Sequence, residues 1–140
     1  MNAVDLEDKL KAKKIIQDYF GDRKDIAVVY LFGSTVSARL LEQSDVDIGV
    51  LYKPDCIPDM MQRLQEQTEL SGLLQREVDL VTLNQASPIL GYQVLKYGEC
   101  ILKPDQRAAN QFFVCTLNEY FDLKMCRRVI EQSLSSLRIL

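Results

Sequence analysis

The stretch LFGSTVSARLLEQSDVDIGVLY, residues 31–52, interrupts two apolar runs with polar residues that a core strand does not need. The first run begins at Ile26 and stops at Gly33-Ser34, and ten residues separate this pair from Asp45-Val46-Asp47. The second run then continues to Tyr52. Aspartate is a poor strand former and is costly to bury. The stretch therefore predicts two strands joined by a segment whose polar residues have a function.

The pair Asp45 and Asp47 predicts a cation site. Side chains at positions i and i+2 of a strand share one face and lie about 7 Å apart. Two like charges this close favour either a raised pKa or a bound cation. The chain has no histidine and no Cys-x-x-Cys pair, and oxygen-only ligands suit Mg²⁺. Asp79, which interrupts the apolar run 77–83, is predicted to complete the set as a metal ligand or general base.

The pair Gly33-Ser34 predicts an anion site beside these carboxylates. Glycine lets the backbone approach a ligand closely, and amides at the start of a helix, here expected over 35–41, bind phosphate. The Ser34 hydroxyl would add one more hydrogen bond. An Asp-x-Asp or a Gly-Ser pair alone is usually an ordinary surface or turn feature. Their joint arrangement favours nucleotidyl transfer, in which metal ions stabilise the attacking and leaving oxygens of an in-line displacement.

The remaining sequence alternates strands with helices. Helical periodicity, caps and β-branched runs predict helices over 4–20, 58–70, 89–97 and 105–138, the last as one long helix or two consecutive ones, and strands over 26–32, 46–52, 77–83 and 99–102. Tyr92 and Tyr97 are predicted to be half-buried packing residues. This order predicts an α+β (mixed α/β) fold, with a sheet of about four strands flanked by helices and followed by a long C-terminal helical segment.

Composition excludes several classes of protein. The 140 residues carry a net charge of −3 and a pI near 5.0, which argues against stable nucleic-acid binding over a broad surface. No apolar run is long enough to span a membrane, and the acidic, polar N-terminus does not resemble a signal peptide. Four scattered cysteines fit a reducing cytoplasm. We expect one cytoplasmic domain over residues 1–140, with its core at about 10–103 and a helical extension over 104–140.

The spacing of Gly33-Ser34 and Asp45-Val46-Asp47 resembles the G-S-x10-D-x-D signature of the DNA polymerase β-like nucleotidyltransferase superfamily. The continuation EVDLVTLNQASPILGYQVLKYGECIL, residues 77–102, is similar to the MNT (minimal nucleotidyltransferase) antitoxins of HEPN/MNT toxin–antitoxin pairs. The resemblance covers about residues 10–103.

The resemblance implies a role for each motif residue. Gly33 and Ser34 would hold the triphosphate of ATP, and Asp45, Asp47 and Asp79 would form the catalytic set that binds two Mg²⁺ ions. The partner implied is a HEPN ribonuclease toxin, to which such antitoxins transfer AMP at a tyrosine hydroxyl. Many relatives follow the Gly-Ser pair with Arg and then Arg-Gly. This chain has Arg39 alone, which either contacts a phosphate or lies on a solvated helix face.

Three functions remain open at this point: an AMP-transferring antitoxin, an antitoxin that acts by contact alone, and a transferase for a small hydroxylated molecule such as an aminoglycoside. The C-terminal segment leaves a second choice open. Its apolar residues at helical spacing, Leu123, Cys126, Ile130, Leu134 and Leu137, either form an interface with the toxin or with a second copy, or fold back as internal core.

Overall fold

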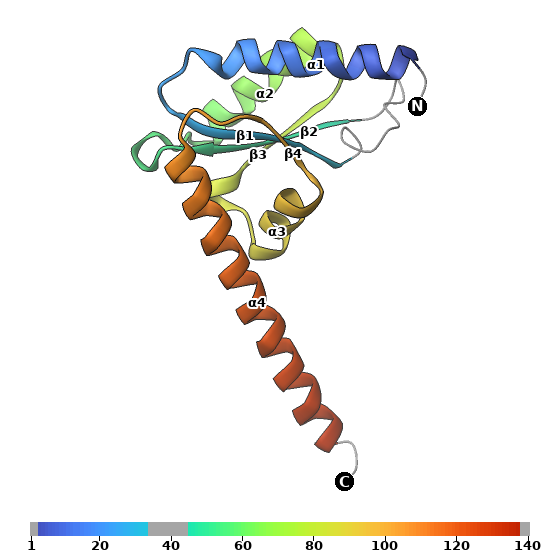
Figure 1. Ribbon diagram of the computed structural model, residues 1–140, viewed down its shortest axis with the longest axis vertical. Helices are drawn as coiled ribbons and strands as arrows, with labels where there is room; N and C mark the ends of the chain where they lie inside the picture. The colour runs from blue at the N-terminus through green and yellow to red at the C-terminus, as the bar shows by residue number, and fades with distance from the viewer. Residues whose placement is uncertain (1–2, 34–44, 138–140) are drawn as a thin grey trace.

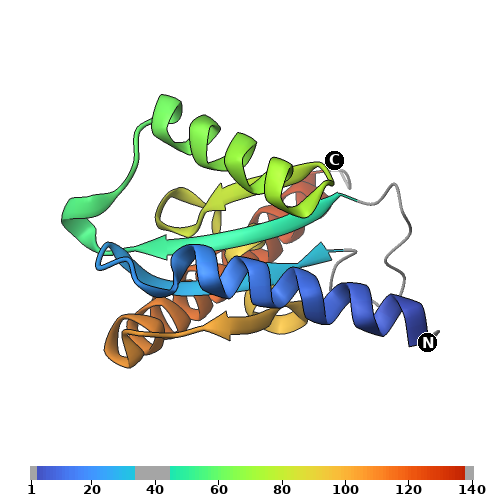
Figure 2. The ribbon, with the colours of Figure 1, turned by 90° about the horizontal axis from the view of Figure 1, so that it is seen from above.

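The computed structural model describes residues 3–33 and 45–137, and it has the predicted α+β architecture. A sheet with helices on both sides is visible in Figure 1 and, from above, in Figure 2. The helices and strands, in chain order, are α1 (Ala3–Gly21), β1 (Ile26–Phe32), β2 (Val46–Tyr52), α2 (Met60–Leu74), β3 (Val78–Thr82), α3 (Pro88–Tyr97), β4 (Glu99–Leu102) and α4 (Gln106–Leu137), with short 3-10 turns η2 (Pro54–Cys56) and η3 (Leu83–Gln85).

The four strands are ordered β3-β2-β1-β4. Strand β1 pairs antiparallel with β2 and with β4, whereas β2 and β3 are parallel. This mixed sheet places the C-terminal end of β1 beside the N-terminal ends of β2 and β3. We call this end of the sheet the carboxylate end, because Gly33, Asp45, Asp47 and Asp79 lie there.

Both faces of the sheet are covered, as the continuous apolar runs of β1 and β2 predict. Helices α1 and α2 cover one face, with Ile16, Phe20 and Leu70 in a core cluster against the strands. Helices α3 and α4 cover the other face, where Val94 and Ala109 join a second cluster. Strand residues alternate between these two clusters except at the register shift of β1, where Ala27 and Val28 both belong to the second.

The predicted helix 58–70 is shifted in the structure, where α2 runs from Met60 to Leu74. Asp59, not Pro58, caps its start. Ser71 and Gly72, which directly follow the predicted range, lie inside the helix. The helix ends instead at Gln75, which adopts the left-handed conformation with φ 54°. This conformation is uncommon for a residue other than glycine, so composition gave no sign of it.

Helix α2 also seals the outer edge of β3. Three side chains one turn apart on α2 satisfy backbone groups that an edge strand would leave exposed. The Ser71 hydroxyl accepts from the Val78 amide (3.2 Å) and the Gln67 carbonyl oxygen accepts from the Leu80 amide (3.0 Å). The Arg63 guanidinium donates to the Leu80 carbonyl (3.2 Å). These hydrogen bonds to the backbone of β3 explain why α2 continues past Ser71.

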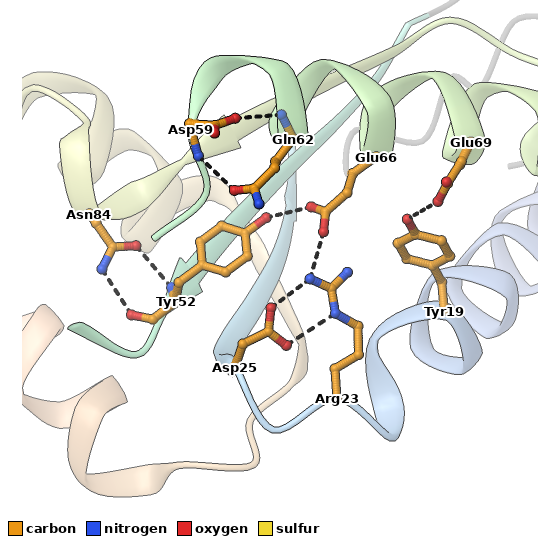
Figure 3. Close-up of polar contacts among 9 residues, drawn as sticks. All are labelled: Tyr19, Arg23, Asp25, Tyr52, Asp59, Gln62, Glu66, Glu69 and Asn84. Atoms are coloured by element: carbon orange, nitrogen blue, oxygen red, sulfur yellow. Dashed lines mark hydrogen bonds and ion pairs between the residues drawn. The ribbon is translucent and has the colours of Figure 1, made fainter. Parts of the chain in front are cut away.

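A polar network closes the end of the sheet opposite the carboxylate end (Figure 3). The buried Tyr52 hydroxyl donates to Glu66 (2.9 Å), and the Arg23 guanidinium bridges Glu66 (2.5 Å) and Asp25 (2.6 Å). The Asn84 side chain pairs with both the amide and the carbonyl of Tyr52, at 2.9 Å each. The network therefore joins the start of β1 and the end of β2 to α2 and η3, and no buried side-chain polar atom of the described residues lacks a hydrogen-bond partner.

Helix α3 begins one residue before the predicted range 89–97 and ends at the predicted residue. Its N-cap is Ser87, whose hydroxyl accepts from the Leu90 amide (3.2 Å), and Pro88 occupies the first turn. Gly98 follows the last residue of the helix, and its φ of −79° lies outside the left-handed region. A Cβ at this position would lie 2.3 Å from the Val94 carbonyl oxygen and 3.0 Å from that of Leu31. Glycine is therefore needed because α3 approaches β1 closely here.

The C-terminal segment is one helix, α4, rather than two consecutive helices. Its first turns pack on the sheet and on α3, with Ala109 and Thr116 buried. Its later turns extend away from the rest of the fold (Figure 1), and Ile130 and Leu134 are 57% and 55% exposed. Fold-back into an internal core is therefore wrong for this part of the stripe. In the described residues no helix is both long and apolar enough to cross a membrane.

Candidate active site

The carboxylate end of the sheet brings the predicted glycine and aspartates together. Phe32, the last residue of β1, pairs with Asp47 of β2, and Asp47 pairs in turn with Asp79 of β3. Adjacent strands lie about 4.8 Å apart, so Asp47 and Asp79 present neighbouring carboxylates. Asp45 immediately precedes β2 and is exposed to solvent. Ser34 and Arg39 lie outside the described residues, as does the expected helix over 35–41.

Gly33 packs directly against the Asp47 carboxylate. Its φ is +68°, in the left-handed region that glycine enters without strain. A Cβ built on Gly33 would lie 2.1 Å from Asp47 Oδ2, far inside the contact distance of real atoms. Both observations require glycine at this position. The first residue of the Gly-Ser motif and the second aspartate of the Asp-x-Asp motif are thus in contact, although thirteen residues separate them in sequence.

The electrostatics of the site centre on Asp47. Partial burial raises the pKa of this carboxyl above its ordinary value, and repulsion from Asp79 and then from Asp45 raises it further. The Asp47 carboxyl is therefore close enough to both neighbouring carboxylates to be affected by their charge. A cation placed among them would relieve this repulsion. The arrangement therefore favours positively charged ligands at a point next to the Gly33 backbone.

The donor set fits Mg²⁺ in its chemistry. In the ranges 3–33 and 45–137, no three His, Cys, Asp or Glu side chains form a group that could hold a metal ion unaided. Mg²⁺ does not need such a group, since it is usually held by one or two carboxylates together with water and substrate phosphates. Asp47 and Asp79 supply two carboxylates from adjacent strands. Their assignment as ligands, with Asp45, stays a prediction.

One residue near the carboxylate end differs from its sequence prediction. Tyr97, at the end of α3, is 64% exposed and is not a half-buried packing residue. Tyr92 is half-buried as predicted, because its ring stacks on Tyr120 of α4 at 3.8 Å. A single exposed tyrosine carries no sequence signal that separates it from a packed one. Only the position of α3 in the fold distinguishes Tyr97.

Comparison with known proteins gives the family. The family model for polymerase β nucleotidyltransferases matches residues 13–107. The chain is 33% identical to the protein adenylyltransferase MntA of Shewanella oneidensis over 122 residues, which are 87% of this chain and 86% of MntA.

Solved structures agree with this match. A toxin–antitoxin crystal structure with AMP-PNP contains a chain that is 30% identical, with a TM-score of 0.74 over 89% of this chain and 98% of that one. The MNT antitoxin in complex with the tri-AMPylated HEPN toxin of Shewanella oneidensis is 29% identical, with a TM-score of 0.70 over 91% and 98% of the two chains. The protein therefore belongs to the polymerase β nucleotidyltransferase family, among the MNT antitoxins related to MntA.

Proposed function

We propose that this protein is an antitoxin that transfers AMP from ATP to a tyrosine hydroxyl of a cognate HEPN ribonuclease toxin in the cytoplasm. The relatives support the donor and the acceptor, since one is named a protein adenylyltransferase and another was crystallised with an AMPylated HEPN toxin. The four cysteines are all free thiols, which suits a reducing compartment.

The contact between Gly33 and Asp47 is the observation that carries the proposal. Backbone at Gly33 can approach a phosphate closely because no side chain intervenes. In this proposal, a triphosphate held there would present its α-phosphate to the Asp47 and Asp79 carboxylates, which are paired across β2 and β3. Bound Mg²⁺ would supply positive charge to the attacking and leaving oxygens of the transfer. Asp45, Asp47 and Asp79 are the residues that would hold it, and Ser34 and Arg39 would contact the phosphates.

The reaction transfers one group between two oxygens. The tyrosine oxygen forms a bond to the α-phosphorus, and the bond from that phosphorus to the oxygen bridging to the β-phosphate breaks. Pyrophosphate leaves, and the phenolic proton passes to a carboxylate or to water. Asp79 is exposed at the carboxylate end and is the carboxylate we assign to the incoming hydroxyl, as general base or metal ligand.

The exposed part of α4 is the surface we assign to the toxin. Its apolar side chains beyond the core include Phe121, Met125, Ile130 and Leu134, each at least half exposed. Large apolar side chains exposed on a projecting helix are unfavourable in water and favour a protein partner. Relatives of this chain were crystallised in complex with a toxin. An acceptor docked on α4 would reach the carboxylate end from the α3 and α4 side of the sheet.

The experiment measures whether inhibition outlasts contact. Toxin is incubated with this protein, ATP and Mg²⁺, separated from it, and assayed for ribonuclease activity. We expect wild-type protein to leave the toxin inactive after separation. The matched control is Asp47→Asn, which keeps the side-chain shape and the α4 surface but removes one carboxylate. Toxin treated with this variant should regain activity.

A second candidate, inhibition by contact alone, is favoured by the same exposed part of α4. It predicts that toxin recovers fully after separation from either protein. Full recovery after wild-type treatment would therefore replace the proposed transfer with the contact mechanism.

A further inference from the structure

The part of α4 that extends beyond the fold carries large apolar side chains on two opposite sides. Successive helical residues are about 100° apart around the helix axis, so residues four apart share a side. Phe121, Met125 and Val129 share the side that we call the outer face, and each is at least half exposed. Ile130 and Leu134, also exposed, share the side that we call the seam face. Ile130 follows Phe121 by nine residues, or about two and a half turns, so the two faces point in opposite directions.

The seam face continues the side of α4 that packs on the fold. Phe112 precedes Ile130 by eighteen residues, about five full turns, and therefore lies on the same side of the helix. Phe112 packs against the second core cluster, and a Cβ at Gly91 of α3 would lie 2.9 Å from the methyl group of Thr116, one turn further along α4. Helix α3 thus covers this side in the first turns of α4. At Ile130 the same side is 57% exposed and is available to a partner.

Charged residues separate the two faces. One boundary between them carries a strip of charged side chains, and the other carries Asp122; the residues of the strip are Lys124, Arg127, Arg128 and Glu131. All of these side chains are exposed. A single partner that wrapped around α4 would remove the charges from water, which is costly unless each one is paired. Two partners, one on each face, would leave the charges at the rim of each contact, where polar groups stay hydrated. The pattern therefore fits two separate partner surfaces better than one enclosing cleft.

We infer that α4 binds two toxin molecules at once, one on its outer face and one on its seam face. The inference rests on the proposed function, which assigns the exposed part of α4 to the toxin, and both faces lie within that part. The two faces also have the same chemistry, since each presents large apolar side chains one helical turn apart. A protein bound in this way would hold two toxin molecules while its carboxylate end modifies one tyrosine hydroxyl at a time.

The experiment counts the toxin particles bound to each copy of this protein. The two proteins are mixed without ATP, with toxin in excess, and the mass of the complex is read by native mass spectrometry. Toxin measured alone gives the mass of one toxin particle, whatever its own oligomeric state. We expect the wild-type protein to bind two toxin particles.

Paired aspartate substitutions remove one face at a time. Met125→Asp with Val129→Asp places charges on the outer face, and Ile130→Asp with Leu134→Asp places them on the seam face. Each pair should reduce the complex to one toxin particle, and the four changes together should abolish binding. Because all four side chains are more than half exposed, the melting temperature should stay at the wild-type value. Serine at the same four positions gives the same test without added charge. The matched control Glu131→Gln, on the charged strip, should still bind two particles.

A wild-type complex that saturates at one toxin particle would overturn the inference and leave the proposed transfer intact. Two bound particles for both paired variants would overturn it as well. A complex that contains two copies of this protein, and that one paired variant reduces to one copy, would assign that face to self-association instead of to the toxin. If the wild-type protein binds no toxin at all, the proposed function fails, and the inference fails with it.

Discussion

Replacement of Gly33 by alanine tests the contact on which the site is built. The new Cβ would stand 2.1 Å from Asp47 Oδ2 and 3.1 Å from its Cγ. Because the carboxylate is the far end of a side chain, it can turn away, at a cost of about 0.5–1.5 kcal/mol for an unfavourable rotamer. Alanine at a φ of +68° costs about 1–2 kcal/mol more.

We therefore expect Gly33→Ala to lower the free energy of unfolding by about 1.5–3.5 kcal/mol and to leave the protein folded. The effect on transfer should be larger. Displacing a catalytic carboxylate by about 1 Å can cost roughly 100-fold in rate. Urea denaturation measures the first quantity, and transfer of label from [α-³²P]ATP to the toxin measures the second.

Two controls isolate the contact. Gly72→Ala places a methyl group where no atom lies within 4 Å, inside α2, and should raise stability by about 0.5–1 kcal/mol. In an Asp47→Ala background the clash is absent, so Gly33→Ala should cost only the backbone part, about 1–2 kcal/mol. Equal costs in the two backgrounds, or full transfer activity in Gly33→Ala, would refute the reasoning.

Three further changes test other parts of the structure. Tyr52→Phe removes a buried hydrogen bond to Glu66 and should cost about 1.5–3 kcal/mol in denaturation experiments, whereas Tyr19→Phe, whose hydroxyl bonds an exposed carboxylate, should cost less. Hydrogen bonds from the Arg23 guanidinium lower the pKa of Asp25 below its ordinary 3.8. The stability that Asp25 contributes is therefore present above pH 3.8 and is lost as the pH falls through the lowered pKa. Asp25→Asn should make the free energy of unfolding less dependent on pH across this acid range. Ile130→Asp should weaken toxin binding in calorimetry without changing the melting temperature, because this side chain is 57% exposed.

The strands were predictable because their residue types strongly favour the extended conformation. The runs 26–32, 46–52 and 99–102 have the predicted bounds, and 77–83 is shortened by one residue at each end in β3. Continuous β-branched and aromatic runs suit only a strand covered on both faces. Strand order and direction carry no such local signal. Nothing in the composition of β3 states that it pairs parallel with β2 and places Asp79 beside Asp47.

The misplaced features depend on tertiary contacts. Ser71 and Gly72 are typical of a helix end, yet Ser71 lies in α2 because its hydroxyl bonds the first amide of β3. Motif spacing predicted that Gly33 and the aspartates act together, and the structure adds that Gly33 touches Asp47. The exposure of Tyr97 follows from the path of α3 under the sheet. Periodicity alone assigned it to packing.

Intact-mass spectrometry of the toxin tests the central claim most directly. Toxin is incubated with this protein, ATP and Mg²⁺, and its mass is compared with that of toxin incubated with Asp47→Asn. The account predicts a mass increase of one or more AMP units with the wild-type protein, located on tyrosine, and none with the variant. An unmodified toxin that is nevertheless bound and inhibited by both proteins would contradict it.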